Sequence, residues 1–408
     1  MFQLQEIPPA FLRNPYPFYQ MLRGMGPVVP DPTGRFMAID HKPVSTVLRD
    51  RRFITKNVWN GENAKCLEQS LFARIEASMM LHRDPPAHTR LRALVSRAFT
   101  PKIVADLAST VQLTANGLID AVGARGEMDV IADFAYPLPV TIIAEMLGVP
   151  HADMQSFRTW SKRLTELQSV RLTQAAGPIT PALLAPLDET VQWFVDYLEG
   201  LVEERRKSSR RDLLSALVVA EEAGDQLSAD DLMAMVVLLL VAGHETTMNL
   251  IGNGLLALLR NPAERARLEG DPSLAENAVE ELLRFDSPVQ ITIRVASVDV
   301  ELESTTIPAG AEVIVMLGAA NRDPERYAAP DKLDLRRKDV LPISFGGGIH
   351  YCLGAPLARL EGRIALPTLL CRLPGLSLRD DVNPDELAWN PNIALRGLQS
   401  LPVVFRPA

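Results

Sequence analysis

The longest regular pattern in this sequence runs from Ser228 to Arg260 and predicts a single helix. Ser228 followed by Asp231 is typical of a helix start, because a hydroxyl and an acid both stabilise the N-terminal N–H groups. At 1.5 Å per residue, a helix of about 33 residues is roughly 50 Å long. A helix of that length crosses the body of a globular protein, so we expect a mainly helical fold organised around it.

The predicted helix changes character halfway along. The stretch LMAMVVLLLV at 232–241 contains no charge or hydroxyl, and AGHETTMNLIGN then brings in Glu245 and Thr246. A buried acid and a buried hydroxyl cost free energy unless they are hydrogen-bonded. Either these groups are satisfied inside a large helical protein, or they line a cavity and handle protons. The segment alone leaves both interpretations open.

A zinc-protease motif is one candidate for this segment. His244 and Glu245 begin the pattern HExxH, in which two histidines one helical turn apart bind the metal. The residue four positions after His244 is Met248. Because a thioether is a poor zinc ligand, the sequence argues against a zinc site here.

Composition excludes several classes of protein. The 408 residues carry a net charge of −8, whereas nucleic-acid-binding proteins usually present a basic face to phosphates. The three cysteines, Cys66, Cys352 and Cys371, include no CxxC pair, which indicates a reducing compartment and excludes a disulfide framework. We therefore expect no nucleic-acid partner.

The N-terminal segment has no basic start followed by an apolar core, so it does not resemble a secretory signal. The longest strongly apolar run, Leu232 to Gly243, is too short to span a bilayer. We expect a soluble, cytoplasmic protein without a membrane anchor. The sequence contains no flexible linker and no repeat, which favours one compact unit.

Helical patterns continue through most of the chain. Besides the long helix, a helix opens at NPYPFYQMLR, and others are predicted at 41–50, 85–98, 102–122, 137–147, 151–167, 185–206, 210–222, 262–269, 272–284 and 355–371. A β-hairpin is predicted in VVPDPTGRFMAID, with its turn at Asp31 to Gly34, and short strands follow Pro288. The expected fold class is mainly α with small β-sheets.

The strongest chemical signal is the segment FGGGIHYCLGAPLARLEGRIAL at 345–366. Its glycines allow the backbone to approach a flat, bulky group closely. Cys352 lies just before the predicted helix, where N–H groups favour a thiolate. A single thiolate suits one coordination position of a metal, such as the axial position of haem iron. The alternative is a buried, inert cysteine in a glycine loop.

This loop resembles the haem-binding loop of the cytochrome P-450 superfamily of haem-thiolate monooxygenases. Two further motifs resemble the same superfamily, namely AGHETT at 242–247 and the ExxR pair Glu281 and Arg284. The resemblance covers nearly the whole chain. It implies the cytochrome P-450 fold, with the long central helix over the haem, in a single domain spanning residues 1–408 with a small β-rich subregion.

The resemblance also implies roles for individual residues. Cys352 would be the axial ligand of the iron in haem b, and Glu281, Arg284 and Arg337 would support the cysteine loop. The haem propionates would be bound by His88, Arg92, Arg294 and His350. Without the cysteine loop, His88 and Arg92 would instead be taken for a solvated helical face.

The implied reaction inserts one atom of O2 into a lipophilic small molecule, by hydroxylation or epoxidation. Glu245 and Thr246 would handle protons, and Ala242 and Gly243 would leave space for oxygen. Electrons would come from NAD(P)H through a ferredoxin or flavodoxin with its reductase, docking near Arg359 and Arg363, unless these arginines are solvated or paired with neighbours of Glu361.

Substrate-lining residues follow from position alone. They are the loop 57–81 and Leu239, Ala242, Gly243, Thr247, Val289, Ile291 and Ile393. Because most are apolar, the substrate is expected to be a terpenoid, fatty acid, polyketide or aromatic compound. A peroxide-driven peroxygenase and a non-catalytic haem sensor or ligand carrier remain alternatives, although Glu245 and Thr246 favour the use of dioxygen.

Overall fold

The computed structural model describes residues 8–55, 65–96, 99–173, 179–210, 212–222 and 228–407. By its internal contacts the chain divides into two compact units, each drawn from separate segments. Unit 1 comprises Met1–Ile54, Ala108–Leu138 and Thr246–Ala408, and unit 2 comprises Thr55–Leu107 and Pro139–Glu245. The single domain expected from the sequence stays a prediction.

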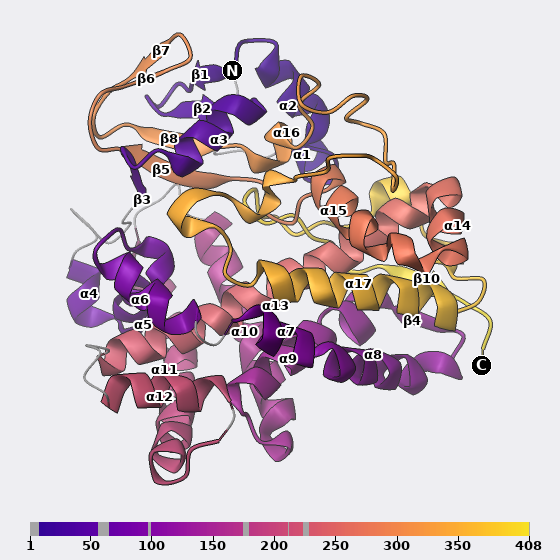
Figure 1. Ribbon diagram of the computed structural model, residues 1–408, viewed down its shortest axis with the longest axis horizontal. Helices are drawn as coiled ribbons and strands as arrows, with labels where there is room; N and C mark the ends of the chain where they lie inside the picture. Colours follow the sequence, from indigo (N-terminus) through magenta and orange to yellow (C-terminus); the bar gives the residue numbers. More distant parts are fainter. Residues whose placement is uncertain are drawn as a thin grey trace. The chain divides into compact units, whose positions relative to one another are not determined.

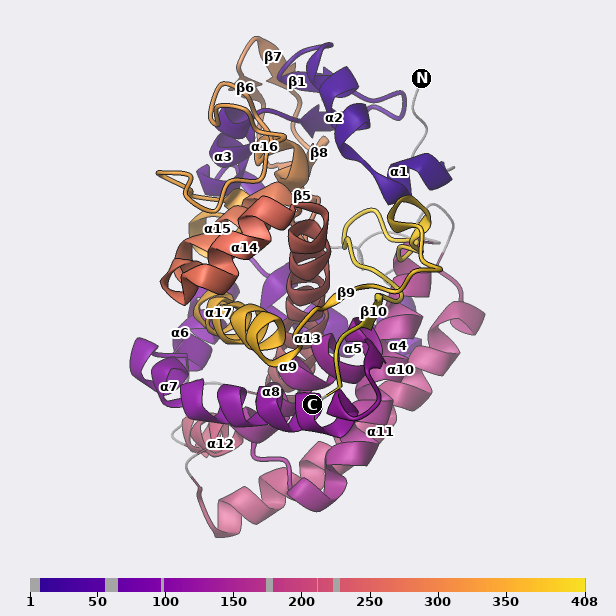
Figure 2. The same cartoon turned by 90° about the vertical axis from the view of Figure 1, so that its right-hand side faces the viewer.

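The long helix predicted from the sequence is present as α13, Ala229–Arg260, and is continuous over 32 residues (Figure 2). Its start is capped reciprocally, because the Asp231 N–H donates to the Ser228 hydroxyl at 3.0 Å and the Ser228 N–H donates to the Asp231 carboxylate at 3.4 Å. The division between the units falls inside this helix, after Glu245.

Helix α13 is also long and apolar enough to cross a membrane by length and composition over Asp230–Arg260. The polar residues in its second half do not bring its hydropathy below that of a membrane span. The run counted from the sequence, Leu232 to Gly243, therefore underestimates the length of the apolar segment. However, 78% of its most apolar window is buried inside the protein. Burial of this kind is typical of a core helix.

A five-stranded sheet, together with α3 (His41–Arg49), forms one end of unit 1 (Figure 1). Its strands, in spatial order, are β1 (Val28–Pro30), β2 (Phe36–Ala38), β8 (Glu312–Val315), β5 (Thr292–Ala296) and β3 (Phe53–Thr55). The predicted hairpin is confirmed as the antiparallel pair β1–β2. Strand β2 then pairs in parallel with β8, and β8 pairs antiparallel with β5. Side chains such as Val44, Phe53 and Val313 form the core beneath the sheet.

Unit 1 also contains helices outside the sheet. These are α1 (Pro9–Arg13), α2 (Tyr16–Arg23), α8 (Ala108–Gly123), α14 (Pro262–Gly270), α15 (Ala275–Phe285), α16 (Leu317–Ala320) and α17 (Ala355–Arg372). Helix α17 packs against both α8 and α15. Gly362 of α17 packs closely against both α15 and α13, since a Cβ there would be 3.2 Å from Val279 and 3.3 Å from Leu250.

Two small sheets complete unit 1. One contains β4 (Glu127–Asp129), β10 (Pro402–Val404) and β9 (Ser377–Leu378), and the other contains β6 (Val300–Leu302) and β7 (Thr305–Ile307). Strand β10 pairs with both of its neighbours, so the end of the described chain is held in a sheet. With helices predominating over short strands, the fold class predicted from the sequence is confirmed.

Unit 2 is helical in its described part. Its helices are α4 (Cys66–Gln69), α5 (Leu71–Ser78), α6 (Ala87–Ser96), α7 (Pro101–Asp106), α9 (Pro137–Leu147, whose first two residues belong to unit 1), α10 (Met154–Thr173), α11 (Pro181–Lys207) and α12 (Leu213–Glu222). Rings of Trp160, Trp193 and Tyr197 stack between α10 and α11, with centroids 4.9 and 5.3 Å apart. The buried Arg205 donates to Asp212 at 2.7 Å and to the Gly148 carbonyl at 2.7 Å, which joins α11 to the segments beside α9 and α12.

Several predicted helices differ from those observed. The helix expected at 185–206 is Pro181–Lys207, and the helices expected from 151, 210 and 272 begin at Met154, Leu213 and Ala275. The helix expected at 102–122 is interrupted at Leu107, which separates α7 from α8. The helix expected from Pro85 begins at Ala87, because a residue that precedes a proline, as Pro85 precedes Pro86, is disfavoured in the helical conformation. The Asp84 carboxylate, which precedes that helix, accepts hydrogen bonds from the backbone and hydroxyl of Thr55.

Candidate active site

The cysteine loop, residues 345–354, lies in unit 1 just before α17. Of two short 3-10 turns, Ile343–Phe345 leads into the loop and Gly348–His350 lies within it. The Cys352 N–H donates to the Phe345 carbonyl at 2.9 Å, which closes the loop, and Cys352 itself is half-buried. Helix α17 begins three residues later at Ala355. Across the described ranges, no three His, Cys, Asp or Glu side chains are grouped to hold a metal ion. A metal at Cys352 would therefore need most of its ligands from a cofactor, which is the case for iron in a porphyrin.

Close packing against α3 requires a glycine in this loop. Gly348 has φ +64°, and a Cβ at this position would lie 2.3 Å from the Leu48 carbonyl oxygen. Both its conformation and the space around it exclude a side chain. The loop is thereby held on the last turn of α3.

Glu281, Arg284 and Arg337 lie together beneath the loop. The Arg284 Nε and Nη2 donate to the two Glu281 carboxylate oxygens at 2.7 and 2.8 Å, and both side chains are fully buried. The Arg337 Nε lies 3.1 Å from each oxygen, and the Asp334 N–H also donates to Glu281 at 3.0 Å. The buried carboxylate is therefore surrounded by donors, which compensates its desolvation.

Asn321 connects this network to the cysteine loop. Arg284 donates to the Asn321 carbonyl at 3.0 Å. The Asn321 side chain accepts from the Ile343 N–H at 2.8 Å and donates to the Ser344 hydroxyl at 2.8 Å. Ser344 in turn donates to the Leu283 carbonyl of α15. Sequence reasoning did not find Asn321 or Ser344, because no local pattern marks a loop amide that bridges two distant segments.

Unit 1 contains two of the residues expected to bind propionates. Arg294 on β5 is buried, and its Nη1 donates to the Ile293 carbonyl at 2.8 Å. His350 is half-buried and lies two residues before Cys352. A thiol accompanied by a guanidinium and an imidazole is the donor set required by an iron porphyrin that carries carboxylates. The residues present therefore fit haem.

The other two expected propionate ligands belong to unit 2. His88 and Arg92 lie four residues apart on α6, with His88 buried and Arg92 half-buried. Burial, with a further contribution from the Arg92 charge, lowers the pKa of His88. His88 is therefore a neutral imidazole at neutral pH and still offers a ring N–H as a donor.

Glu245 is 8% exposed, and burial raises the pKa of its carboxyl to about 7. A carboxyl with this pKa exchanges a proton near neutral pH. His244 differs, because its ring Nδ1 lies 2.6 Å from the Leu240 carbonyl and burial lowers its pKa to about 4. His244 is thus held against its own helix, and Met248 is buried, which agrees with the argument against a zinc site.

The exposure of side chains along α13 is uneven. Ala242 is exposed and Gly243 and Thr246 are half-buried, whereas Leu240 and Thr247 are buried. Positions 242, 243 and 246 share one face of the helix. Helix α13, which is otherwise mostly buried, is therefore partly exposed along one short face. That Ala242 and Gly243 leave space for oxygen stays a prediction.

The remaining predicted substrate-lining residues differ in exposure. On α13, Leu239 is 8% exposed and Thr247 is 2% exposed. In unit 1, Val289, Ile291 and Ile393 are half-buried, and a β-bridge between Val289 and Leu395 brings their two segments together. Residues 57–64 of the predicted lining loop lie outside the described residues. The prediction of a loop is wrong for most of the rest, which forms helices α4 (Cys66–Gln69) and α5 (Leu71–Ser78).

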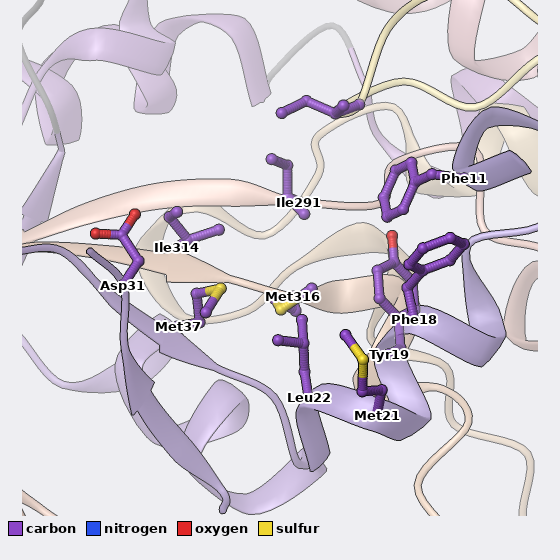
Figure 3. Close-up of a pocket in the computed structure, with 11 residues that line it drawn as sticks. Phe11, Phe18, Tyr19, Met21, Leu22, Asp31, Met37, Ile291, Ile314 and Met316 are labelled. Atoms are coloured by element: carbon purple, nitrogen blue, oxygen red, sulfur yellow. The ribbon is translucent and has the colours of Figure 1, made fainter. Parts of the chain in front are cut away.

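Ile291 and Ile393 line an apolar pocket in unit 1 (Figure 3). The pocket also contains Phe11, Phe18 and Tyr19 from the N-terminal helices. No sequence pattern indicated these three residues, because α1 and α2 carry no motif and meet the strands only through tertiary packing.

The two arginines predicted to dock a redox partner form intramolecular ion pairs. Arg359 binds the Glu280 carboxylate and the Tyr351 hydroxyl, and Arg363 lies 3.2 Å from Glu276. The two carboxylate partners belong to α15, whereas the sequence pointed to neighbours of Glu361, which is itself buried.

Comparison with known proteins gives a consistent result. Residues 36–271 and 272–396 match the family model described as Cytochrome P450. The cytochrome P450 monooxygenase PikC of Streptomyces venezuelae is 41% identical over 97% of this chain and 92% of its own length. The crystal structure of CalO2 superimposes with a TM-score of 0.90 at 34% identity, covering 100% of this chain and 99% of that one.

The crystal structure of myxobacterial cytochrome P450 CYP267B1 in complex with myristic acid is also similar. It has a TM-score of 0.86 and 40% identity, and the match covers 98% of each chain.

Proposed function

The chain belongs to the cytochrome P450 family, and from this membership we propose which of its residues carry out the family's reaction. The protein is a monooxygenase that inserts one oxygen atom of O2 into a lipophilic small molecule. Its cofactor is haem b, and its electrons come from NAD(P)H through redox partners. When bound, haem supplies the activation of dioxygen.

Cys352 is the proposed axial ligand of the haem iron. The observation that supports this most strongly is a half-buried thiol three residues before the first residue of an 18-residue helix, in a loop closed by its own N–H. The N–H groups at the start of α17 favour the thiolate form. Glu281, Arg284 and Arg337 act as positioning residues, because they stabilise the segments that carry the loop.

Glu245 and Thr246 are proposed to handle the protons of the reaction. A carboxyl whose pKa is about 7 can both donate and recover a proton near neutral pH. Thr246 is half-buried on the face of α13 that also carries Ala242 and Gly243. Its hydroxyl can orient a proton donor on this face, and the small residues keep the space beside it open.

The propionates are assigned to four N–H donors, His88, Arg92, Arg294 and His350. The neutral state of His88 does not weaken this assignment, because a neutral imidazole still donates one hydrogen bond. We also assign both units to one cytochrome P450 domain, supported by family matches that include segments of each.

The substrate is assigned to a lipophilic class that includes fatty acyl and polyketide-like molecules. This rests on the apolar character of the lining, which comprises Leu239, Ala242, Gly243, Thr247, Val289, Ile291 and Ile393. It also rests on the similarity to a relative bound to myristic acid. The protein is assigned to the cytoplasm.

The redox partner is proposed to be a ferredoxin or flavodoxin that is reduced by its own reductase and docks at the cysteine loop. Ile349 and Tyr351, three residues and one residue before Cys352, are 38% and 39% exposed. Arg359 donates to the Tyr351 hydroxyl at 3.0 Å, so a positive charge lies beside an exposed ring, as suits the docking of a small acidic protein.

The carbon monoxide difference spectrum of the reduced protein tests the central assignment. A thiolate-ligated iron gives the red-shifted band, and we expect it in the wild type and not in Cys352→Ser. An unshifted band in freshly purified wild type, with haem bound, would show that Cys352 is not the ligand.

A further inference from the structure

Two segments of unit 1, residues 288–291 and 393–396, are paired with each other and are here called the lining wall. Three contacts join them, namely the β-bridge between Val289 and Leu395, the Gln290 N–H on the Ala394 carbonyl at 2.8 Å, and the Arg396 N–H on the Pro288 carbonyl at 2.8 Å. A displacement of one segment therefore displaces the other. The wall contains Val289, Ile291 and Ile393, which are all assigned to the substrate lining.

A buried side chain of α13 attaches the lining wall to that helix. The Asn253 Nδ2 donates to the Arg396 carbonyl at 2.9 Å, and Asn253 is only 2% exposed. Removing a buried donor leaves its acceptor without a partner, which costs more free energy than the bond contributes when it is formed. The position of the wall relative to α13 is therefore coupled to this one amide.

Asn249, one turn earlier on α13, contacts the residue that follows the lining wall. A Cβ on Gly397 would lie 1.8 Å from the Asn249 Oδ1. Asn249 is 1% exposed, and among the described residues neither its Nδ2 nor its Oδ1 has a hydrogen-bond partner. The contact between Asn249 and Gly397 is therefore one of close packing, and it leaves no room for a side chain at position 397.

The attachment at Asn253 also fixes the lining wall relative to Thr246. Asn253 lies seven residues after Thr246, which is roughly two turns and 10 Å along the same face of a helix. Helix α13 is continuous over this stretch. A rigid element therefore connects the residue proposed to handle protons with the attachment point of the wall.

The lining wall has other attachments that do not involve α13. The Arg396 side chain donates to Asp286 at 2.7 Å and to two backbone carbonyls at the end of α1. The Tyr19 hydroxyl of α2 donates to the Gln290 side chain at 2.9 Å. These bonds hold the wall in the fold when the bond from Asn253 is removed, so its distance from α13 can change without unfolding it.

From these contacts we propose that Asn253 is a positioning residue for substrate selectivity, because its amide holds the lining wall at a fixed distance from α13. The inference rests on the proposed function, which assigns Val289, Ile291 and Ile393 to the substrate lining. A ligand long enough to contact the wall is sensitive to its position, whereas a ligand too small to reach it is not.

Optical titration of the haem-loaded protein with imidazole and with phenylimidazole tests the inference. Both probes bind haem iron through a ring nitrogen and shift its absorption band, but only the phenyl group extends towards the substrate lining. Asn253→Leu keeps the approximate size of the side chain and removes the donor. The ratio of the phenylimidazole Kd to the imidazole Kd should rise at least about fivefold, which is the effect of one buried hydrogen bond. An unchanged ratio would overturn the inference.

Asn261→Leu is the matched control. The Asn261 amide also donates to a backbone carbonyl, at 2.8 Å, but this carbonyl belongs to Ala257 of α13 itself. The ratio of the two Kd values should therefore stay at the wild-type value. An equal rise in both variants would show a general loss of stability and would also overturn the inference.

A second pair of variants tests the same distance without changing Asn253. Gly397→Ala introduces a methyl group against the Asn249 amide, so the wall is displaced and the ratio should rise. Adding Asn249→Ala makes room for that methyl group and should restore the ratio. If the double variant keeps the ratio of Gly397→Ala, the distance between the wall and α13 does not set selectivity.

Failure of this inference can be distinguished from failure of the proposed function. If the reduced wild type gives the red-shifted carbon monoxide band and the Kd ratio is unchanged in Asn253→Leu, only the role of Asn253 is wrong. If the wild type lacks that band with haem bound, both are wrong.

Discussion

Glu281 and Arg284 form an ion pair without solvent exposure on either side chain, one helical turn apart on α15. Breaking such a pair leaves an uncompensated buried charge, which costs about 3–5 kcal/mol. Arg284→Ala is therefore expected to lower the free energy of unfolding by that amount, measured by chemical denaturation.

Arg206→Ala is the matched control for this substitution. Glu203 and Arg206 have the same spacing in a helix and lie 2.7 Å apart, but their side chains are 58% and 37% exposed. An exposed pair contributes less than about 1 kcal/mol. Equal losses in the two variants would contradict the stabilising role of burial at Glu281.

The pKa of Glu245 predicts a pH dependence of stability. Its pKa is about 7 in the folded protein against an ordinary value of 4.5, so between these values the folded state retains a proton that the unfolded state has lost. The protonated Glu245 carboxyl contributes its full stabilisation to the folded state below about pH 4.5, and this stabilisation is lost as the pH rises to 7. The loss is on the order of 3 kcal/mol.

Glu245→Gln carries no titrating group at this position. The free energy of unfolding of Glu245→Gln minus that of the wild type should therefore increase between about pH 4.5 and 7. Above pH 7 this difference should be constant. Denaturation curves at a series of pH values measure this difference. A difference that does not change with pH would show that the carboxyl is not desolvated.

Thr246→Ala tests the role of the hydroxyl on the open face of α13. Haem content and substrate binding should be unchanged, while the yield of product per NAD(P)H falls several-fold and hydrogen peroxide increases. Thr246→Ser retains the hydroxyl and should preserve most of the yield. If Thr246→Ala forms as much product per NAD(P)H as the wild type, Thr246 does not handle protons.

Gly348→Ala tests how the cysteine loop is held. The added Cβ would lie 2.3 Å from the Leu48 carbonyl at a φ of +64°, so the loop must move. We expect a large loss of the red-shifted carbon monoxide band. Gly310→Ala is the control, since Gly310 has φ +82° but a Cβ there would meet no atom within 4 Å. That variant should lose only about 1–2 kcal/mol of stability and keep the band.

Arg363→Glu tests the proposed docking surface. The second-order rate of reduction by a ferredoxin should fall several-fold at low salt, and the difference should narrow at high salt, because screening weakens charge attraction. Stopped-flow measurements at several ionic strengths provide the comparison. Arg163→Glu, in unit 2 and 43% exposed, is the control and should leave the rate unchanged.

Local sequence patterns predicted the elements whose signals are local. Helix α13 was located to within one residue because its capping residues and its periodic apolar face lie within the segment itself. The β1–β2 hairpin followed from a turn of four residues. The parallel pairing of β2 with β8 could not be foreseen, because neither strand contains a signal that identifies the other.

In the candidate site, too, features with local signals could be predicted and features that depend on distant segments could not. The pair Glu281 and Arg284 could be found from the sequence because its ExxR pattern lies within four residues of one helix. The bridging role of Asn321 depends on where a loop passes in three dimensions, and the position of Phe11 in the apolar pocket depends on packing between distant segments. Such relationships arise only when the tertiary structure is complete.

The pairing of β2 with β8 has a consequence for synthesis of the protein. Phe36 is paired with Val313, so 277 residues (313 − 36) separate the two partners along the chain. At translation rates of ~5–20 residues per second, β8 is synthesised on the order of 15 to 60 s after the β1–β2 hairpin. During that interval an unpaired strand edge is accessible to other nascent chains. Chaperone capacity during expression should therefore affect the yield of this enzyme.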